Sequence, residues 1–194
     1  DEDYRQMVKR CVYDIAGTTP RDIRVYFNDS IVPIVSFKAY ANMFCPGKSV
    51  HIQLNSRWEV AVFPAAPEED IQVPSYVNCM FTKRGGEHVK VMESVVHSWF
   101  RQEVAKKCKG IKVRLSDVRP HVHIMVNALV VNPSFDSQAK ECLATLPKDF
   151  GPQEYFPRWS ALHKKALGRC KVIDTIVDYV ARRTQTKMAN TSAK

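Results

Sequence analysis

A glutamine and a lysine stand two positions apart just after an apolar run of the chain: Gln138 and Lys140. Pro133 ends the strand that this run predicts, because proline lacks the backbone donor that strand pairing needs. A lysine on a loop is a compact, mobile charge suited to a terminal phosphate, and a glutamine can orient a water or bond a phosphate oxygen. The pair could serve phosphate chemistry, although an isolated Gln-x-Lys sequence is more often a solvated loop.

A basic segment, Lys106-Lys107-Cys108-Lys109-Gly110, is the second candidate site. It ends a predicted long helix, where cations complement the helix dipole. Several cations held together on an exposed tip also suit the neutralisation of DNA phosphates. The residues alone leave both interpretations open.

Two histidines, His121 and His123, alternate along a predicted strand and are expected on one face, where they could bind a metal. No third ligand is evident, and two histidines without a carboxylate or cysteine partner favour a structural role. The six cysteines form no Cys-x-x-Cys pair. The sequence therefore predicts no metal site and reduced thiols.

Hydrophobic periodicity predicts the elements that position these residues. The first part is expected to contain an amphipathic helix over 4–15, a hairpin over 23–34 and a short helix over 36–44 that Ser36 caps. The breaking sequence Cys45-Pro46-Gly47 then predicts a domain boundary after residue 45. The later elements are expected as strands over 50–54, 58–62 and 73–79, a surface loop over 64–70, a helix from Glu87 to Lys107, a strand over 122–130, and two helices after residue 152.

The composition excludes several classes of protein. Of the 194 residues, 45% are hydrophobic and 25% charged, which is typical of a globular protein and not of a disordered one. No apolar run approaches the length that spans a membrane, and the acidic start lacks a signal-peptide pattern, so we expect a soluble, intracellular protein without a membrane partner. The net charge of +9 favours a polyanionic partner, nucleic acid above all.

Five motifs occur in the order in which they are found in type IIA DNA topoisomerases. They are Tyr13-Asp14-Ile15-Ala16-Gly17, Arg57-Trp58-Glu59-Val60, Ser75-Tyr76-Val77-Asn78, Gly85-Gly86-Glu87-His88-Val89 and the segment from Phe135 to Lys140. The last resembles the Gln-Thr-Lys loop of that family, with Ala139 where the family usually has threonine. The whole set resembles the eukaryotic type II enzymes.

The resemblance implies an α+β fold with a mixed sheet and helices packed on one face, similar to ribosomal protein S5 domain 2. It places residues 1–45 in the C-terminal part of a GHKL ATP-binding domain and residues 46–194 in a transducer domain that ends in a helix toward the DNA-cleavage core. Full-length members are ATP-hydrolysing topoisomerases that work as homodimers in the nucleus, or in another DNA-containing organelle such as the mitochondrion. This fragment alone is expected to be inactive, since it contains no glycine-rich loop that cradles a nucleotide.

The resemblance also implies the roles of single residues. Lys140, as the catalytic residue, and Gln138 would contact the terminal phosphate of ATP, with Mg²⁺ held by ligands outside this chain. The loop would couple hydrolysis to the passage of double-stranded DNA. The three lysines of the basic segment, Lys106, Lys107 and Lys109, would contact DNA, and Gly85-Gly86 would be a structural pivot without a ligand.

Two rival hypotheses come from other functional classes. The chain could be a basic nucleic-acid-binding module, or a dimerisation module, with no nucleotide role. Gln138 and Lys140 would then be ordinary surface residues. The first rival predicts duplex binding with a steep salt dependence and no effect of Lys140.

Overall fold

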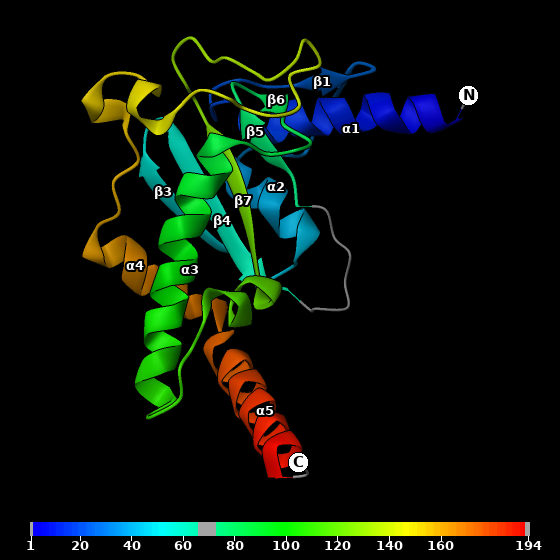
Figure 1. Cartoon of the computed structure of the whole chain (residues 1–194). Helices are drawn as coiled ribbons and strands as arrows, with labels where there is room; N and C mark the ends of the chain where they lie inside the picture. The colour runs from blue at the N-terminus through cyan, green and yellow to red at the C-terminus, as the bar shows by residue number, and fades with distance from the viewer. Residues whose placement is uncertain (1, 66–72, 193–194) are drawn as a thin grey trace.

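The computed structural model describes residues 2–65 and 73–192, and most of the loop expected over 64–70 lies outside them. A five-stranded sheet with the order β3-β4-β7-β5-β6 forms the centre of the molecule (Figure 1). The strands are β3 Val50–Asn55, β4 Trp58–Pro64, β5 Ser75–Val77, β6 Met80–Phe81 and β7 Val122–Ala128. β7 pairs antiparallel with β4 and parallel with β5, so the sheet is mixed, as expected.

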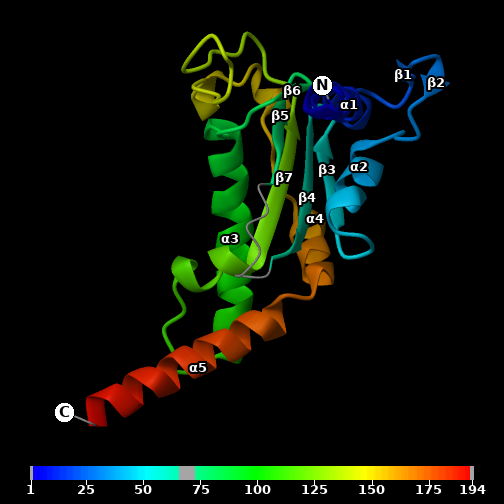
Figure 2. The same ribbon diagram turned by 90° about the vertical axis from the view of Figure 1, so that its right-hand side faces the viewer.

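One face of the sheet is covered by α3 Glu87–Lys107, while α4 Ala161–Leu167 lies beside β3 and α5 Ile173–Ser192 packs against α3. Alternate residues of the central strands point into this face, for example Val60 of β4 and Val126 of β7. They pack with Val96 and Phe100 of α3 and with Ile176 of α5 in one large apolar cluster. Figure 2 shows α3 alongside the sheet and α5 running across the lower end of α3.

The opposite face is covered by the first part of the chain, which holds α1 Glu2–Thr18, α2 Phe37–Phe44 and a hairpin of β1 Tyr26–Phe27 and β2 Ser30–Ile31. The intervening strand positions point this way, so Phe63 and Met125 join a second cluster with Phe37 and Tyr40. Ser36 caps α2 by accepting a hydrogen bond from the Ala39 amide at 3.2 Å, as predicted. The first half of α1 projects beyond the sheet (Figure 1).

The expected strand over 73–79 is wrong in one respect, because the chain turns back at Asn78 and Cys79 to form the β5–β6 hairpin. Both turn residues have positive φ, 51° and 63°. Asparagine tolerates that conformation, but cysteine gives no signal for it. Five short 3₁₀ helices complete the described elements: Leu115–Asp117, Arg119–His121, Pro147–Asp149, Gln153–Tyr155 and Gly168–Cys170. None of the helices within the described ranges is long and apolar enough to cross a bilayer.

Candidate functional site

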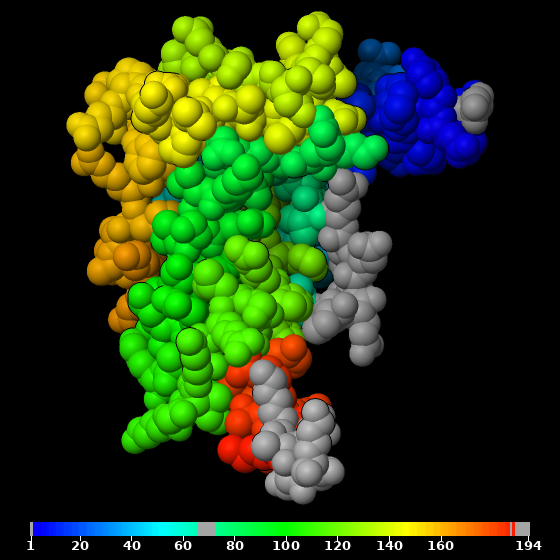
Figure 3. Space-filling view, viewed as in Figure 1, coloured from blue at the N-terminus to red at the C-terminus, as the bar shows by residue number. Residues whose placement is uncertain are grey.

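The segment that carries Gln138 and Lys140 follows β7 and forms the upper rim of the molecule, above the start of α3 (Figure 3). It is shaped by its own backbone. The Lys140 amide donates to the Ser137 carbonyl at 3.0 Å, and the Asp136 amide donates to the Cys142 carbonyl at 3.2 Å. Lys140 itself has a positive φ of 56°. A short, closed loop therefore presents residues 137–141 at the surface.

The base of this loop is joined to the turn that begins α3. The Leu143 amide donates to the Gly85 carbonyl at 3.0 Å, and the Glu87 amide donates to the Leu143 carbonyl at 3.1 Å. Gly86 has φ 136° and ψ −165°, a conformation essentially restricted to glycine. A Cβ there would lie 2.4 Å from the Leu143 nitrogen. The glycine pair thus permits a close backbone approach, which supports the structural role expected for it.

Arg84, which sequence reasoning missed, forms a second link between the two segments. Its guanidinium pairs with the Asp136 carboxylate, and its Nε lies 3.3 Å from Glu141 Oε2. Its backbone amide also donates to the Glu141 carbonyl at 2.8 Å. The only sequence signal was one arginine before the glycine pair and two carboxylates flanking the loop. Nothing in the sequence shows that residues 52 positions apart meet.

The side chains of Gln138 and Lys140 are exposed, as is Ala139 between them. In the part of the chain that the structure describes, neither the Gln138 amide nor the Lys140 ammonium has a hydrogen-bond or ion-pair partner. Both groups are therefore available to a ligand from outside the chain. Their phosphate-binding roles stay predictions.

The basic tip lies at the other end of α3, about 30 Å away along a helix of 21 residues. Lys106 pairs with Glu103 at 2.5 Å, and Lys107 reaches Asp174 of α5 at 2.6 Å. Lys107 thereby links the end of α3 to the start of α5. Lys109 is exposed. The three lysines form one exposed basic end, and DNA contact stays a prediction.

The predicted common face for the two histidines is wrong. His121 lies in a 3₁₀ turn before β7, with its ring 5.0 Å from that of Tyr179 on α5. His123 lies in β7, with its ring 5.5 Å from that of Phe63 on β4. The two rings contact different elements because the regular strand begins only at Val122. No group of three or more potential metal ligands occurs among the described residues.

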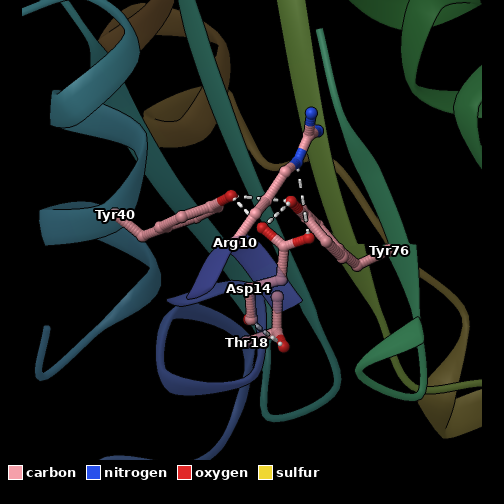
Figure 4. A network of polar contacts seen from close by, with 5 residues as sticks. All are labelled: Arg10, Asp14, Thr18, Tyr40 and Tyr76. Carbon is pink, nitrogen blue, oxygen red and sulfur yellow. Dashed lines mark hydrogen bonds and ion pairs between the residues drawn. The ribbon is translucent and has the colours of Figure 1, made fainter. Parts of the chain in front are cut away.

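A buried polar network joins the first part of the chain to the sheet (Figure 4). The Asp14 carboxylate of α1 accepts hydrogen bonds from the Tyr40 hydroxyl of α2 and, at 3.0 Å, from the Tyr76 hydroxyl of β5. Burial raises the pKa of both tyrosines, so both remain protonated donors at neutral pH. Arg10 lies 3.8 Å from the same carboxylate. The network fixes α1, α2 and β5 relative to one another.

Known proteins resemble this chain along nearly its whole length. A family model described as DNA gyrase B matches residues 28–194. Human DNA topoisomerase 2-alpha is 33% identical over 97% of this chain, and mouse DNA topoisomerase 2-beta is 31% identical over the same share. The chain spans only 12% of the length of these two relatives.

Solved structures agree with the sequence relatives. The ATPase region of Saccharomyces cerevisiae topoisomerase II superimposes with a TM-score of 0.77 at 29% identity, covering 94% of this chain and 46% of that one. The ATPase and transducer domains of topoisomerase II from Balamuthia mandrillaris give a TM-score of 0.79 at 27% identity, covering 91% of this chain and 44% of that one. The fold is therefore that of a part of such a region.

Proposed function

The chain belongs to the DNA gyrase B family, and on that premise we propose that it is part of an ATP-dependent type II DNA topoisomerase. Residues 1–45 are the end of the ATP-binding domain, and residues 46–194 are the transducer domain. The relatives are DNA topoisomerases 2, and the similar solved structures are their ATPase and transducer regions. The larger part of the ATP-binding domain lies outside this chain.

In this proposal Lys140 pairs with the terminal phosphate of ATP, and Gln138 binds the same phosphate or orients the attacking water. The observation that carries this assignment is the closed loop that presents both side chains, unpaired within the described residues, at one surface. An ammonium without an intramolecular partner can stabilise the charge that develops on the phosphoryl oxygens. Mg²⁺ would neutralise phosphate charge, with its ligands supplied by residues outside this chain.

The same loop gives a route by which hydrolysis changes the shape of the enzyme. Backbone hydrogen bonds join the loop to the start of α3, and Lys107 joins the end of α3 to α5. Loss of the terminal phosphate removes the contact of Lys140 with the nucleotide. The transducer domain then reorients relative to the ATP-binding domain, which couples ATP turnover to double-strand passage.

The partners follow from charge and family. Lys106, Lys107 and Lys109 contact the phosphates of double-stranded DNA at the far end of α3. The whole enzyme acts as a homodimer in the nucleus, or in another organelle that contains DNA. Since Lys106 and Lys107 already have carboxylate partners, DNA competes with Glu103 and Asp174 for their charges.

Lys140→Ala in the full-length protein tests the proposal through steady-state ATP turnover. We expect turnover to fall by two orders of magnitude or more, because a charge-assisted phosphate contact in a closed site is worth about 3 kcal/mol or more in the transition state. Gln138→Ala should have a smaller effect, since a neutral amide contributes less than a charge. Lys164→Ala, which removes an exposed lysine of α4, is the matched control. Near-native turnover of Lys140→Ala would refute the assignment.

A further inference from the structure

We propose that Arg84 is a positioning residue for Lys140: it occupies the two carboxylates that flank the loop, so that the lysine charge remains available to the phosphate. This inference rests on the proposed function of the loop. Asp136 precedes the Gln138–Lys140 stretch and Glu141 follows it directly. Both carboxylates pair with the same guanidinium.

The geometry places two carboxylates around one cation. Residues 136 and 142 are held together by a backbone hydrogen bond at 3.2 Å, so the two acidic side chains stay close to the base of the loop. Without Arg84 these carboxylates would lose their guanidinium partner beside Lys140, which Glu141 follows directly in the sequence, and a flexible lysine pairs readily with such a neighbour. The arginine fork can hold two carboxylates at once, which a single ammonium does less well.

Without Arg84, the same two carboxylates would also repel the nucleotide. A triphosphate that approaches Lys140 meets Asp136 and Glu141 at the same rim, and like charges repel. Arg84 reduces this repulsion, because Arg84 and Lys140 together supply two cations that balance the two carboxylates of the rim.

The ion pairs themselves contribute little to folding. The side chain of Arg84 is 57% exposed, and those of Asp136 and Glu141 are 32% and 38% exposed, where ion pairs are weak and screened. The loop keeps its shape through backbone hydrogen bonds and the close approach at Gly86. Removal of Arg84 should therefore leave the fold intact while changing which partner Lys140 binds.

A cycle of variants in the full-length protein separates this electrostatic role from a structural one. We expect Arg84→Ala to lower ATP turnover about 10-fold or more, and Arg84→Lys to lose less because it retains one cation. Combining Arg84→Ala with Asp136→Asn and Glu141→Gln should restore turnover to within about 3-fold of the wild type, since no carboxylate remains to capture Lys140. Asp136→Asn with Glu141→Gln alone should stay near wild type. Arg101→Ala, which removes an exposed arginine of α3, is the control.

Two results would overturn the inference without touching the proposed function. One is wild-type turnover of Arg84→Ala in an enzyme that Lys140→Ala inactivates. The other is a combined variant that stays as slow as Arg84→Ala, because a purely structural arginine would not be rescued by neutral carboxylate replacements. Near-native turnover of Lys140→Ala would instead refute the proposed function, and this inference with it.

Discussion

Among single residues, the buried His88 makes the free energy of unfolding depend measurably on pH. Its side chain is fully buried, with Nε2 3.3 Å from Thr82 Oγ1. Burial lowers the pKa of His88 from 6.5 to about 3, because the charged ring loses its hydration. The folded protein therefore keeps His88 neutral, while the unfolded chain takes up a proton below pH 6.5. His88 thus makes the free energy of unfolding fall as the pH drops from about 6.5 toward 3.

His88→Leu should reduce this pH dependence. We expect the difference in unfolding free energy between pH 7 and pH 5 to shrink by about 2 kcal/mol relative to wild type. Urea unfolding of the chain at both pH values measures it, and carboxylates common to both proteins cancel in the comparison. Equal pH dependence of the two proteins would show that His88 is accessible to protons in the folded state.

At the scale of elements, the junction between the loop and α3 depends on one glycine. Gly86→Ala places a Cβ 2.4 Å from the Leu143 nitrogen in a backbone conformation that alanine avoids. Strain and overpacking together should lower the free energy of unfolding by about 2–6 kcal/mol. Chemical denaturation measures the loss.

Gly110→Ala is the matched control for that prediction. Gly110 also has a positive φ, 79°, but a Cβ there meets nothing within 4 Å. Gly110→Ala should therefore lower the free energy of unfolding only through backbone strain, by about 1–2 kcal/mol. If Gly86→Ala costs no more than Gly110→Ala, the close approach at Leu143 does not hold the loop to α3.

The elements show what local sequence could and could not predict. The bounds of α3 were predicted because its periodic apolar face begins after Gly86 and ends before Gly110. The hairpin at Asn78 and Cys79 was missed because its turn depends on backbone conformations that cysteine does not signal. Exposure of Gln138 and Lys140 follows from their polarity. The role of Arg84 depends on tertiary proximity, which periodicity does not contain.

At the scale of the whole molecule, α3 separates the proposed phosphate-contacting loop from the proposed DNA-contacting tip. Replacing Lys106, Lys107 and Lys109 by alanine should weaken duplex binding of the full-length enzyme. For every DNA phosphate that is no longer neutralised, the slope of log K against log salt should become shallower by about 0.9. Fluorescence anisotropy over a salt series measures the affinity for DNA and its salt slope. The free energy of unfolding should change by less than about 1 kcal/mol, since the ion pairs at this end of α3 are exposed.

The lysines of α4 provide the control for the DNA prediction. Lys164 and Lys165 are also exposed and adjacent in sequence. Their double alanine variant should keep the wild-type affinity and salt slope. If the two sets of variants behave alike, the tip lysines act only as solvated charges at the end of α3.

The proposed function requires Lys140 to lie at the terminal phosphate of bound ATP. An acyl phosphate of ATP, with the acyl group on the terminal phosphate, tests it directly by transferring that group to a nearby lysine amine. We expect peptide mass spectrometry of the full-length enzyme to find acylated Lys140, suppressed by excess ATP, with Lys164 unmodified. Two results would contradict the proposed position of Lys140. One is the absence of acylation at Lys140 while ATP protects other lysines, and the other is acylation of Lys140 that excess ATP does not reduce.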